Sequence, residues 1–233
     1  AGTMDALQFG FFSPAAQVAG SGLIFTACFL VTRYLVFPSR SFDFCNRSIS
    51  ILHSCLALYL TGLAIDWGSP FERLGGNPTN GAELFSMSVS LGYFIYDTLC
   101  VFVDTMDIVG TLHHAATIAG LWVGVFTGIG GAELVQCLFL MEVSTPFMHL
   151  RMIFKEAGLA STSLAKMNEV TFGVSYIICR VFLASPLLYF TMTAPIQNWQ
   201  HILLKAGATG IWVVSIFWLS KIIKVITGKP RKK

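Results

Sequence analysis

The sequence predicts an all-α membrane protein with seven transmembrane helices, a lumenal N-terminus and a cytosolic C-terminus. Of its 233 residues, 55% are hydrophobic and only 12% are charged, whereas soluble domains carry about 25% charged residues. The mean hydropathy is +0.69. Several apolar stretches are about 20 residues long, which at ~1.5 Å per residue suffices to cross the ~30 Å hydrocarbon core.

Seven apolar segments are separated by turns rich in glycine, proline, asparagine and aspartate. The predicted spans are 15–37, 47–65, 83–103, 108–127, 132–152, 168–190 and 202–226. We expect no cleavable signal peptide, because the first apolar run is long and has no small-residue cleavage pattern.

The orientation follows from the lysines and arginines near the span ends. With seven spans, twelve of these residues fall on one side: Arg33, Arg40, Arg47, Arg151, Lys155, Lys166, Lys221, Lys224, Lys229, Arg231, Lys232 and Lys233. Only Arg73 and Lys205 fall on the other side. Because positive charge marks the cytosolic side, the richer side is predicted to be cytosolic.

The span 108–127 contains no Asp, Glu, Lys or Arg, yet it carries the adjacent histidines His113 and His114. Ionisable residues inside a membrane are costly, so they usually face a polar cavity and mark a functional site. The alternative is that both histidines only hydrogen-bond to neighbouring helices.

Polar residues on five spans fall at similar depths. Counted from the cytosolic ends, His53, Asp97, His113 and His114 lie about 8–10 Å deep, Glu142 about 15 Å and Arg180 about 18 Å. We therefore expect His53, Asp97, His113, His114 and Glu142 to face one internal cavity.

The helical periodicity gives the two histidines different surroundings. His113 shares a face with small and polar residues, which are Ala116, Thr117, Gly120 and Gly124. His114 points about 100° away, so the pair is not suited to chelating one metal. One imidazole could act as a base or attack an acyl thioester, while Asp97 or Glu142 holds the other. Alternatively, Asp97 and Glu142 clamp helices together.

The next two spans carry further polar groups. Glu142, Thr145 and His149 share one face, and Pro146 frees a backbone carbonyl near Glu142. On the following span, Arg180 requires an acidic partner, for which Glu142 and a lipid headgroup are the candidates.

The cysteines and the net charge argue against several classes of protein. Six scattered cysteines indicate neither a disulfide framework nor a zinc site. The net charge of +3 does not indicate nucleic-acid binding, because the basic residues lie at helix ends.

Three sequence motifs, in this order along the chain, resemble those of one protein family. Gly92-Tyr93 with Asp97, His113-His114 with Thr117, and the stretch from Glu142 to Phe147 are similar to the TLC domain (TRAM, LAG1, CLN8) family. The likeness is greatest to its small TLC domain-containing, TMEM56-like members. His53 and Arg180 also fit that pattern.

The resemblance implies a division into residues 1–40 with the first helix, a six-helix TLC domain at 41–226, and a basic cytosolic tail at 227–233. It also implies lipid metabolism or homeostasis, since ceramide synthases of this family transfer an acyl chain from acyl-CoA. Those enzymes carry a His-Asp pair and a further Asp where this chain has Met141-Glu142 and Ser144-Thr145.

We therefore expect an acyltransferase that takes acyl-CoA as substrate and holds no permanent cofactor. The candidate catalytic residues are His113, His114, Asp97 and Glu142; the candidate substrate-binding residues are His53, Tyr93, Thr117, Thr145, His149 and Arg180. The expected partners are membrane lipids, and the expected location is the endoplasmic reticulum, because the basic tail loosely resembles a retrieval signal. The alternatives are a non-catalytic lipid-binding protein and a structural subunit of a larger membrane complex.

Overall fold

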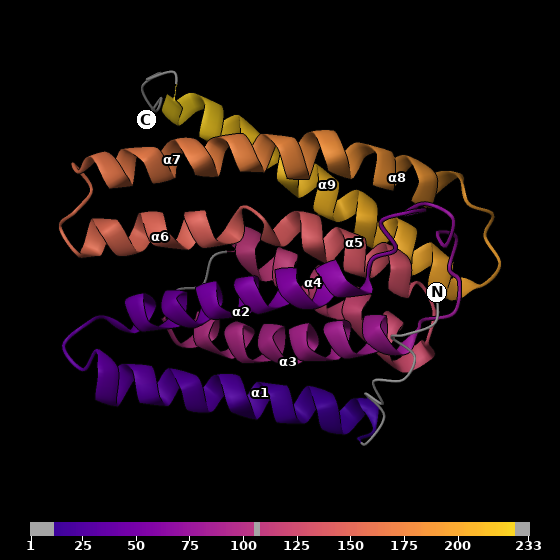
Figure 1. Ribbon diagram of the computed structural model, residues 1–233, viewed down its shortest axis with the longest axis horizontal. Helices are drawn as coiled ribbons and strands as arrows, with labels where there is room; N and C mark the ends of the chain where they lie inside the picture. Colours follow the sequence, from indigo (N-terminus) through magenta and orange to yellow (C-terminus); the bar gives the residue numbers. More distant parts are fainter. Residues whose placement is uncertain (1–11, 105–107, 227–233) are drawn as a thin grey trace.

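The computed structural model describes residues 12–104 and 108–226, and these fold into helices joined by short connections (Figure 1). The helices are α1 (Pro14–Val31), η1 (Thr32–Val36), α2 (Phe42–Ala64), α3 (Gly81–Asp104), α4 (Ile108–Thr127), α5 (Gly131–Glu142), α6 (Thr145–Glu156), α7 (Ser163–Tyr176), η2 (Ile177–Leu183), α8 (Ala184–Thr193) and α9 (Trp199–Ile226). The predicted basic tail and part of the predicted turn at 104–107 lie outside the described residues.

Side chains at the helix starts explain where several helices begin. The hydroxyls of Ser13, Ser41 and Thr162 accept hydrogen bonds from backbone N–H groups in the first turns of α1, α2 and α7. Before α3, Asn80 and Glu83 cap each other, since each side chain accepts the backbone N–H of the other at 2.9 Å. Such caps satisfy N–H groups that have no partner within the helix.

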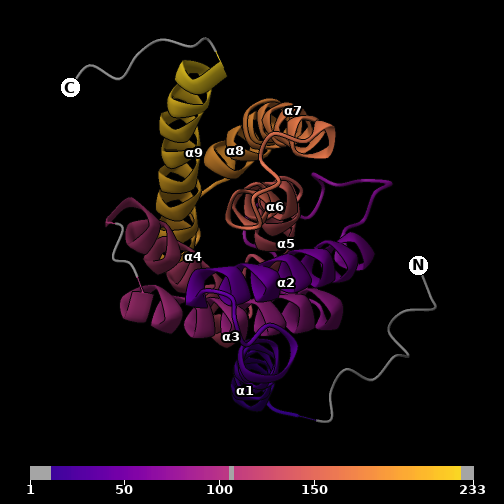
Figure 2. The ribbon, with the colours of Figure 1, turned by 90° about the vertical axis from the view of Figure 1, so that its left-hand side faces the viewer.

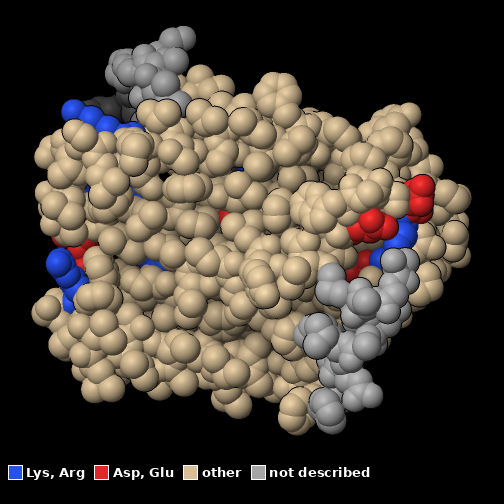
Figure 3. Space-filling view, viewed as in Figure 1, with Lys and Arg blue, Asp and Glu red and all other residues tan. Residues whose placement is uncertain are grey.

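Within the described part of the chain, six helical stretches are long and apolar enough to cross a membrane. They are Pro14–Val36, Phe42–Ala64, Gly81–Asp104, Gly131–Glu156, Ser163–Thr193 and Trp199–Ile223. The predicted span 108–127 forms α4 with the predicted bounds, although this helix is not among the six. On the face shown in Figure 3, most of the visible Lys, Arg, Asp and Glu side chains lie toward the two ends, and residues of other types cover most of the middle.

The helices form a bundle with α1 at its edge (Figure 2). α1 packs closely on α3, where the Ser21 hydroxyl donates to the Val18 carbonyl at 3.1 Å and lies 3.2 Å from the Val89 carbonyl. A Cβ atom at Gly92 would fall 1.9 Å from Ser21 Oγ and 2.4 Å from the Val18 carbonyl oxygen. Only glycine permits this approach of the two helices.

Two of the predicted spans are interrupted in their middle. The predicted span 132–152 is divided into α5 and α6 by a turn at Val143 and Ser144, next to Pro146. The predicted span 168–190 contains the π-helical segment η2 between α7 and α8. Proline removes a backbone donor, and π-helical turns are found at functional sites in many helices.

The loop before α3 is tied to the turn between α4 and α5. The Thr79 N–H donates to the Gly128 carbonyl at 2.9 Å, and the Gly130 N–H donates to the Asn77 carbonyl at 3.1 Å. Gly128 and Gly130 have φ angles of 69° and 79°, which favour glycine. These bonds close one end of the bundle.

Candidate functional site

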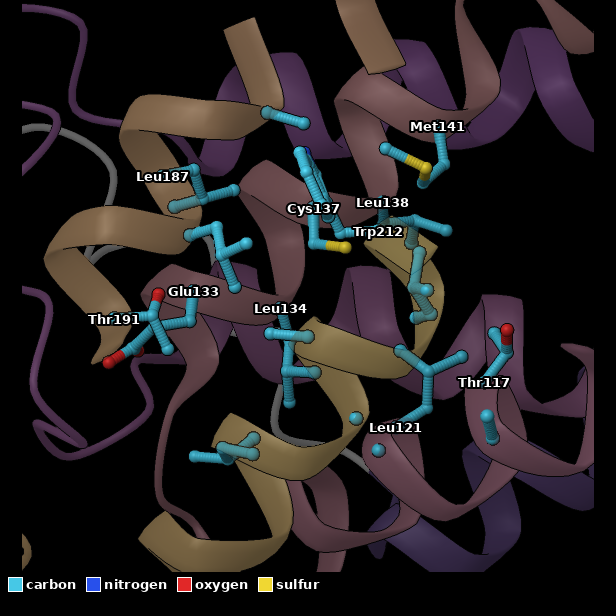
Figure 4. A pocket seen from close by; sticks show the side chains of 18 of the residues that line it. Thr117, Leu121, Glu133, Leu134, Cys137, Leu138, Met141, Leu187, Thr191 and Trp212 are labelled. Carbon is cyan, nitrogen blue, oxygen red and sulfur yellow. The ribbon is translucent and has the colours of Figure 1, made fainter. Parts of the chain in front are cut away.

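A cavity of about 960 Å³, counting its open mouth, lies among α4, α5, α8 and α9 (Figure 4). We call it the main cavity. Its wall is largely apolar, with residues such as Leu121, Leu134, Leu187 and Trp212. The lining of the main cavity therefore has the apolar character that a hydrocarbon chain requires.

The predicted face of α4 forms one wall of the main cavity. His113, Ala116, Thr117 and Gly120 all line it. The Nδ1 atom of His113 is buried and has no hydrogen-bond partner among the described residues. The ring lies 5.5 Å from that of Trp218, measured between centroids. The Nδ1 atom therefore remains available to a ligand that reaches it.

Gly124 shares the predicted face of His113 but does not line the main cavity. A Cβ atom at Gly124 would fall 2.5 Å from Leu134 Cδ1 and 2.7 Å from Met87 Sδ. The residue lies one turn beyond Gly120, where α4 packs tightly against α3 and α5. Its small size allows close packing of helices instead of ligand access.

Glu142 is another ionisable residue in the wall of the main cavity. It is 5% exposed, and its Oε2 atom has no hydrogen-bond partner in the described part of the chain. The hydroxyls of Ser54 and Thr145 lie beside its carboxyl group. A buried carboxyl group with a free oxygen could receive a proton or a hydrogen bond from a ligand.

His114 belongs to a separate polar cluster between α2, α3 and α4. Its Nε2 lies 3.5 Å from Oδ2 of Asp97, and its Nδ1 lies 3.3 Å from the Thr98 hydroxyl. Asn46 donates to Oδ1 of Asp97 at 2.8 Å and accepts from the Tyr96 hydroxyl at 2.7 Å. None of these residues lines the main cavity. The two adjacent histidines therefore have different environments, as their angular separation predicts.

His53 also lies outside the main cavity. Its ring stacks on that of Tyr93, with 3.6 Å between centroids and 6° between planes, and its Nε2 lies 3.3 Å from the Ser90 hydroxyl. His53 is 1% exposed and Tyr93 4%. Of the five residues expected to face one cavity, His113 and Glu142 do so, whereas His53, Asp97 and His114 lie between packed helices.

Arg180 joins the two interrupted spans. Its Nε donates to the Ser144 hydroxyl at 3.1 Å, and its Nη2 donates to the Met141 carbonyl at 2.6 Å and to the Thr145 hydroxyl at 3.3 Å. We expected an acidic partner such as Glu142, but the described residues give Arg180 no ion pair. Two side-chain hydroxyls and one backbone carbonyl at the break between α5 and α6 accept hydrogen bonds from the guanidinium instead.

His149 lies near the beginning of α2, away from His113. Its Nδ1 is 3.4 Å from Nη1 of Arg47, which forms an ion pair with Asp43 at 2.6 Å. It does not line the main cavity.

A glutamate and a histidine in or beside the main cavity were not identified from the sequence. Glu133 lines it near the start of α5, and His201 lies beside it near the start of α9. Both sit at helix ends, where polar residues are common, so sequence pattern alone does not distinguish them. In the described part of the chain, no group of three His, Cys, Asp or Glu residues is arranged to hold a metal.

Comparison with known proteins agrees with the resemblance to the TLC domain family that the sequence motifs indicate. A sequence profile of the TLC domain matches residues 43–224. TLC domain-containing protein 2 of Danio rerio is 31% identical over 98 residues, which are 41% of this chain and 39% of that protein. TLC domain-containing protein 1 of Gallus gallus is 31% identical over 161 residues, 66% of this chain and 61% of that protein.

The Rattus norvegicus form of TLC domain-containing protein 1 is 29% identical, also over 161 residues. The chain spans between 39% and 62% of the length of these curated relatives. The profile covers every described helix from α2 to α8 and most of α9, while α1 precedes it. Together with the six apolar helices found among the described residues, this match shows that the chain is a membrane protein of the TLC domain family.

Proposed function

We propose that the main cavity holds the acyl chain of a lipid, and that the protein transfers this chain from acyl-CoA to a lipid acceptor. One observation carries the proposal: His113, whose Nδ1 has no partner among the described residues, lies in the wall of a largely apolar cavity that Glu142 also lines. An apolar wall binds hydrocarbon, and a neutral imidazole can accept a proton from an attacking group.

In the proposed reaction, His113 takes the proton from a hydroxyl or amine of the acceptor as that group attacks the thioester carbonyl. The carbon–sulfur bond breaks, and the proton passes from His113 to the leaving thiolate of CoA. The products are the acylated acceptor and free CoA. His114, held by Asp97, would fix the position of α4 and act as a positioning residue.

We further propose that α4 crosses the membrane as a seventh span, with the N-terminus lumenal and the C-terminus cytosolic. The α1–α2 and α6–α7 connections lie at the same end of the bundle (Figure 1), and this end carries Arg40, Arg47, Arg151 and Lys155. In this orientation CoA thioesters would reach His113 from the cytosol. We also propose the endoplasmic reticulum as the location.

A second candidate function is lipid binding without catalysis. It is favoured by the separation of His114 and Asp97 from the main cavity, since no carboxylate hydrogen-bonds to His113 among the described residues. A catalytic base is commonly oriented by such a partner.

The cavity can be tested with a pair of matched substitutions on α9. Ala208 lines the main cavity, whereas Ala206 is exposed. We expect Ala208→Trp to fill the cavity and to lower the amount of acyl lipid that co-purifies with the protein, as measured by mass spectrometry. Ala206→Trp should retain the wild-type amount. Equal retention by both variants would contradict the proposal.

A further inference from the structure

The connection between α2 and α3 lies against one end of the main cavity. Residues 66–80, which we call the α2–α3 loop, form a series of turns at the end of the bundle where α5 begins and α8 ends (Figure 1). Gly75 and Gly76 of this loop line a smaller cavity, which we call the side cavity. Three residues line both the side cavity and the main cavity: Glu133, Thr191 and Leu204. The loop therefore meets α5, α8 and α9 directly beside the main cavity.

Glu133 fastens the middle of the α2–α3 loop to the bundle. Its Oε1 accepts the backbone N–H groups of Gly75 and Gly76 at 2.5 and 2.7 Å. Both glycines have positive φ angles, 101° and 72°, and successive N–H groups in such a turn can converge on one anion. Glu133 is 6% exposed and lies in the first turn of α5. A single buried carboxylate oxygen thus holds the two glycines in place.

The other contacts of this loop bury little apolar surface. Nε2 of Gln136 on α5 donates to the Pro70 carbonyl at 2.6 Å, and Arg73 forms an ion pair with Glu83 on α3. The ring of Phe71 stacks on a ring of α8, yet Phe71 remains 41% exposed. Every residue between 66 and 80 is at least partly exposed. Segments with few buried apolar contacts open at a low cost in free energy.

The two ends of the loop have anchors of their own. Its pairing with the turn between α4 and α5 fixes residues 77–79. At the other end, Nε1 of Trp67 donates to the Gly62 carbonyl of α2 at 2.8 Å. Residues 68–76 lie between these anchors, so they can lift from the bundle without a change in α2 or α3.

We propose that residues 68–76 form a lid, which Glu133 and Gln136 latch over one end of the main cavity and which admits water to this cavity when it opens. In the latched position, Gly76 packs against the ring of His201, since a Cβ atom there would fall 1.3 Å from Nε2. When the lid opens, Oε1 of Glu133 exchanges its two backbone donors for water. Oε2, which has no hydrogen-bond partner among the described residues, gains water at the same time and lowers the cost of opening.

This inference concerns the access of water to the main cavity and does not depend on acyl transfer. A closed lid would nevertheless serve the proposed reaction. Water that enters the cavity competes with the acceptor for the thioester, so a site that excludes water suppresses hydrolysis.

Two measurements on the purified full-length protein in phosphatidylcholine nanodiscs test the lid. Hydrogen exchange, followed by mass spectrometry of the peptide that contains Gly75 and Gly76, reports how often their N–H groups leave Glu133. Alkylation of Cys137 by a charged, water-soluble maleimide reports how often solutes from water reach the main cavity, because Cys137 lines it (Figure 4).

Two variants weaken the latch in different ways. Glu133→Gln keeps an acceptor oxygen but loses the charge, and we expect exchange and alkylation to become about tenfold faster, because hydrogen bonds to a charged acceptor are the stronger ones. Gln136→Leu removes the donor to Pro70, and we expect both rates to rise about fivefold. Glu72→Gln, at an exposed position of the same loop, is the control and should keep the wild-type rates.

The two measurements separate the latch from the seal. Unchanged exchange at Gly75 and Gly76 in both folded variants would show that Glu133 and Gln136 do not latch the loop. Faster exchange without faster alkylation of Cys137 would show that the loop does not seal the main cavity. Either result would overturn the proposal, as would alkylation of the wild-type protein as fast as that of the denatured protein.

Thermal unfolding shows which variants are folded. If Glu133→Gln does not fold, Gln136→Leu decides alone, because Gln136 lines neither the main cavity nor the side cavity. Neither measurement uses acyl-CoA, so the absence of acyl transfer would leave the test of the lid intact.

Discussion

The Nε2 atom of His114 lies 3.5 Å from Oδ2 of Asp97, whereas the neighbouring His113 has no such partner among the described residues and lines the main cavity. The two adjacent histidines thus separate into one that is held by the protein and one that is free to meet a ligand. The structure gives them distinct surroundings even though the sequence presents them as a pair.

Asp97→Asn tests the positioning of α4 by this contact. The amide oxygen of the substituted side chain could still accept from Asn46, so we expect little change in melting temperature. The loss of charge beside His114 should weaken their contact and lower acyl transfer about tenfold, the factor that a charge-assisted hydrogen bond can supply. Thioester consumption and thermal unfolding of the same preparation give both quantities. A large fall in melting temperature with normal activity would make the contact purely structural.

Gly92→Ala tests the close approach of α1 and α3. The added Cβ would overlap both the Ser21 hydroxyl and the Val18 backbone, so the helices must separate. We expect a loss of about 1–3 kcal/mol in the free energy of unfolding, typical of an overpacked site. Gly20→Ala on α1 is the control, because a Cβ there meets nothing within 4 Å. Thermal unfolding in one detergent compares them, and equal melting temperatures would refute the packing argument.

Glycosylation tags test the proposed orientation. A tag in the loop 68–80 between α2 and α3 should be modified in the lumen, and a tag at 157–162 between α6 and α7 should remain unmodified. A gel-mobility shift that is removed by a glycosidase reports modification. Modification of the second tag alone would reverse the orientation and would place His113 nearer the opposite side.

Much of the fold was predictable because hydropathy dictates which segments can lie in lipid. The predicted bounds of α4 are correct, and the effect of Pro146 on the helix after Glu142 is confirmed by the turn between α5 and α6. The π-helical segment η2 was not predicted. Within it, Arg180 donates to the oxygens of Met141 and Ser144 at the break between α5 and α6, a tertiary contact that a local pattern does not encode.

The site was only partly predictable for a related reason. Counting residues from the helix ends gives the depth of a side chain but not the direction in which the helix is rotated. His53 and His113 have similar predicted depths, yet His53 stacks on Tyr93 between helices while His113 lines the main cavity. Glu133 and His201 were missed because residues near helix ends are ordinarily solvated, and only the folded loop at Gly76 buries them.

The most direct test of the central claim is acyl transfer by purified protein carrying His113→Ala. Protein in nanodiscs is mixed with radiolabelled oleoyl-CoA and a panel of lipids bearing hydroxyl or amine groups, and labelled product and free CoA are measured. Cys55→Ala, at an exposed position on α2, is the control for substitution in the membrane region. Thermal unfolding shows whether each variant is folded.

We predict that the wild-type protein and Cys55→Ala form labelled product, and that folded His113→Ala is slower by about a hundredfold or more, the contribution of a general base. Equal rates for the wild-type protein and folded His113→Ala would contradict the catalytic role of His113. No product from the wild-type protein with any acceptor would favour lipid binding without catalysis.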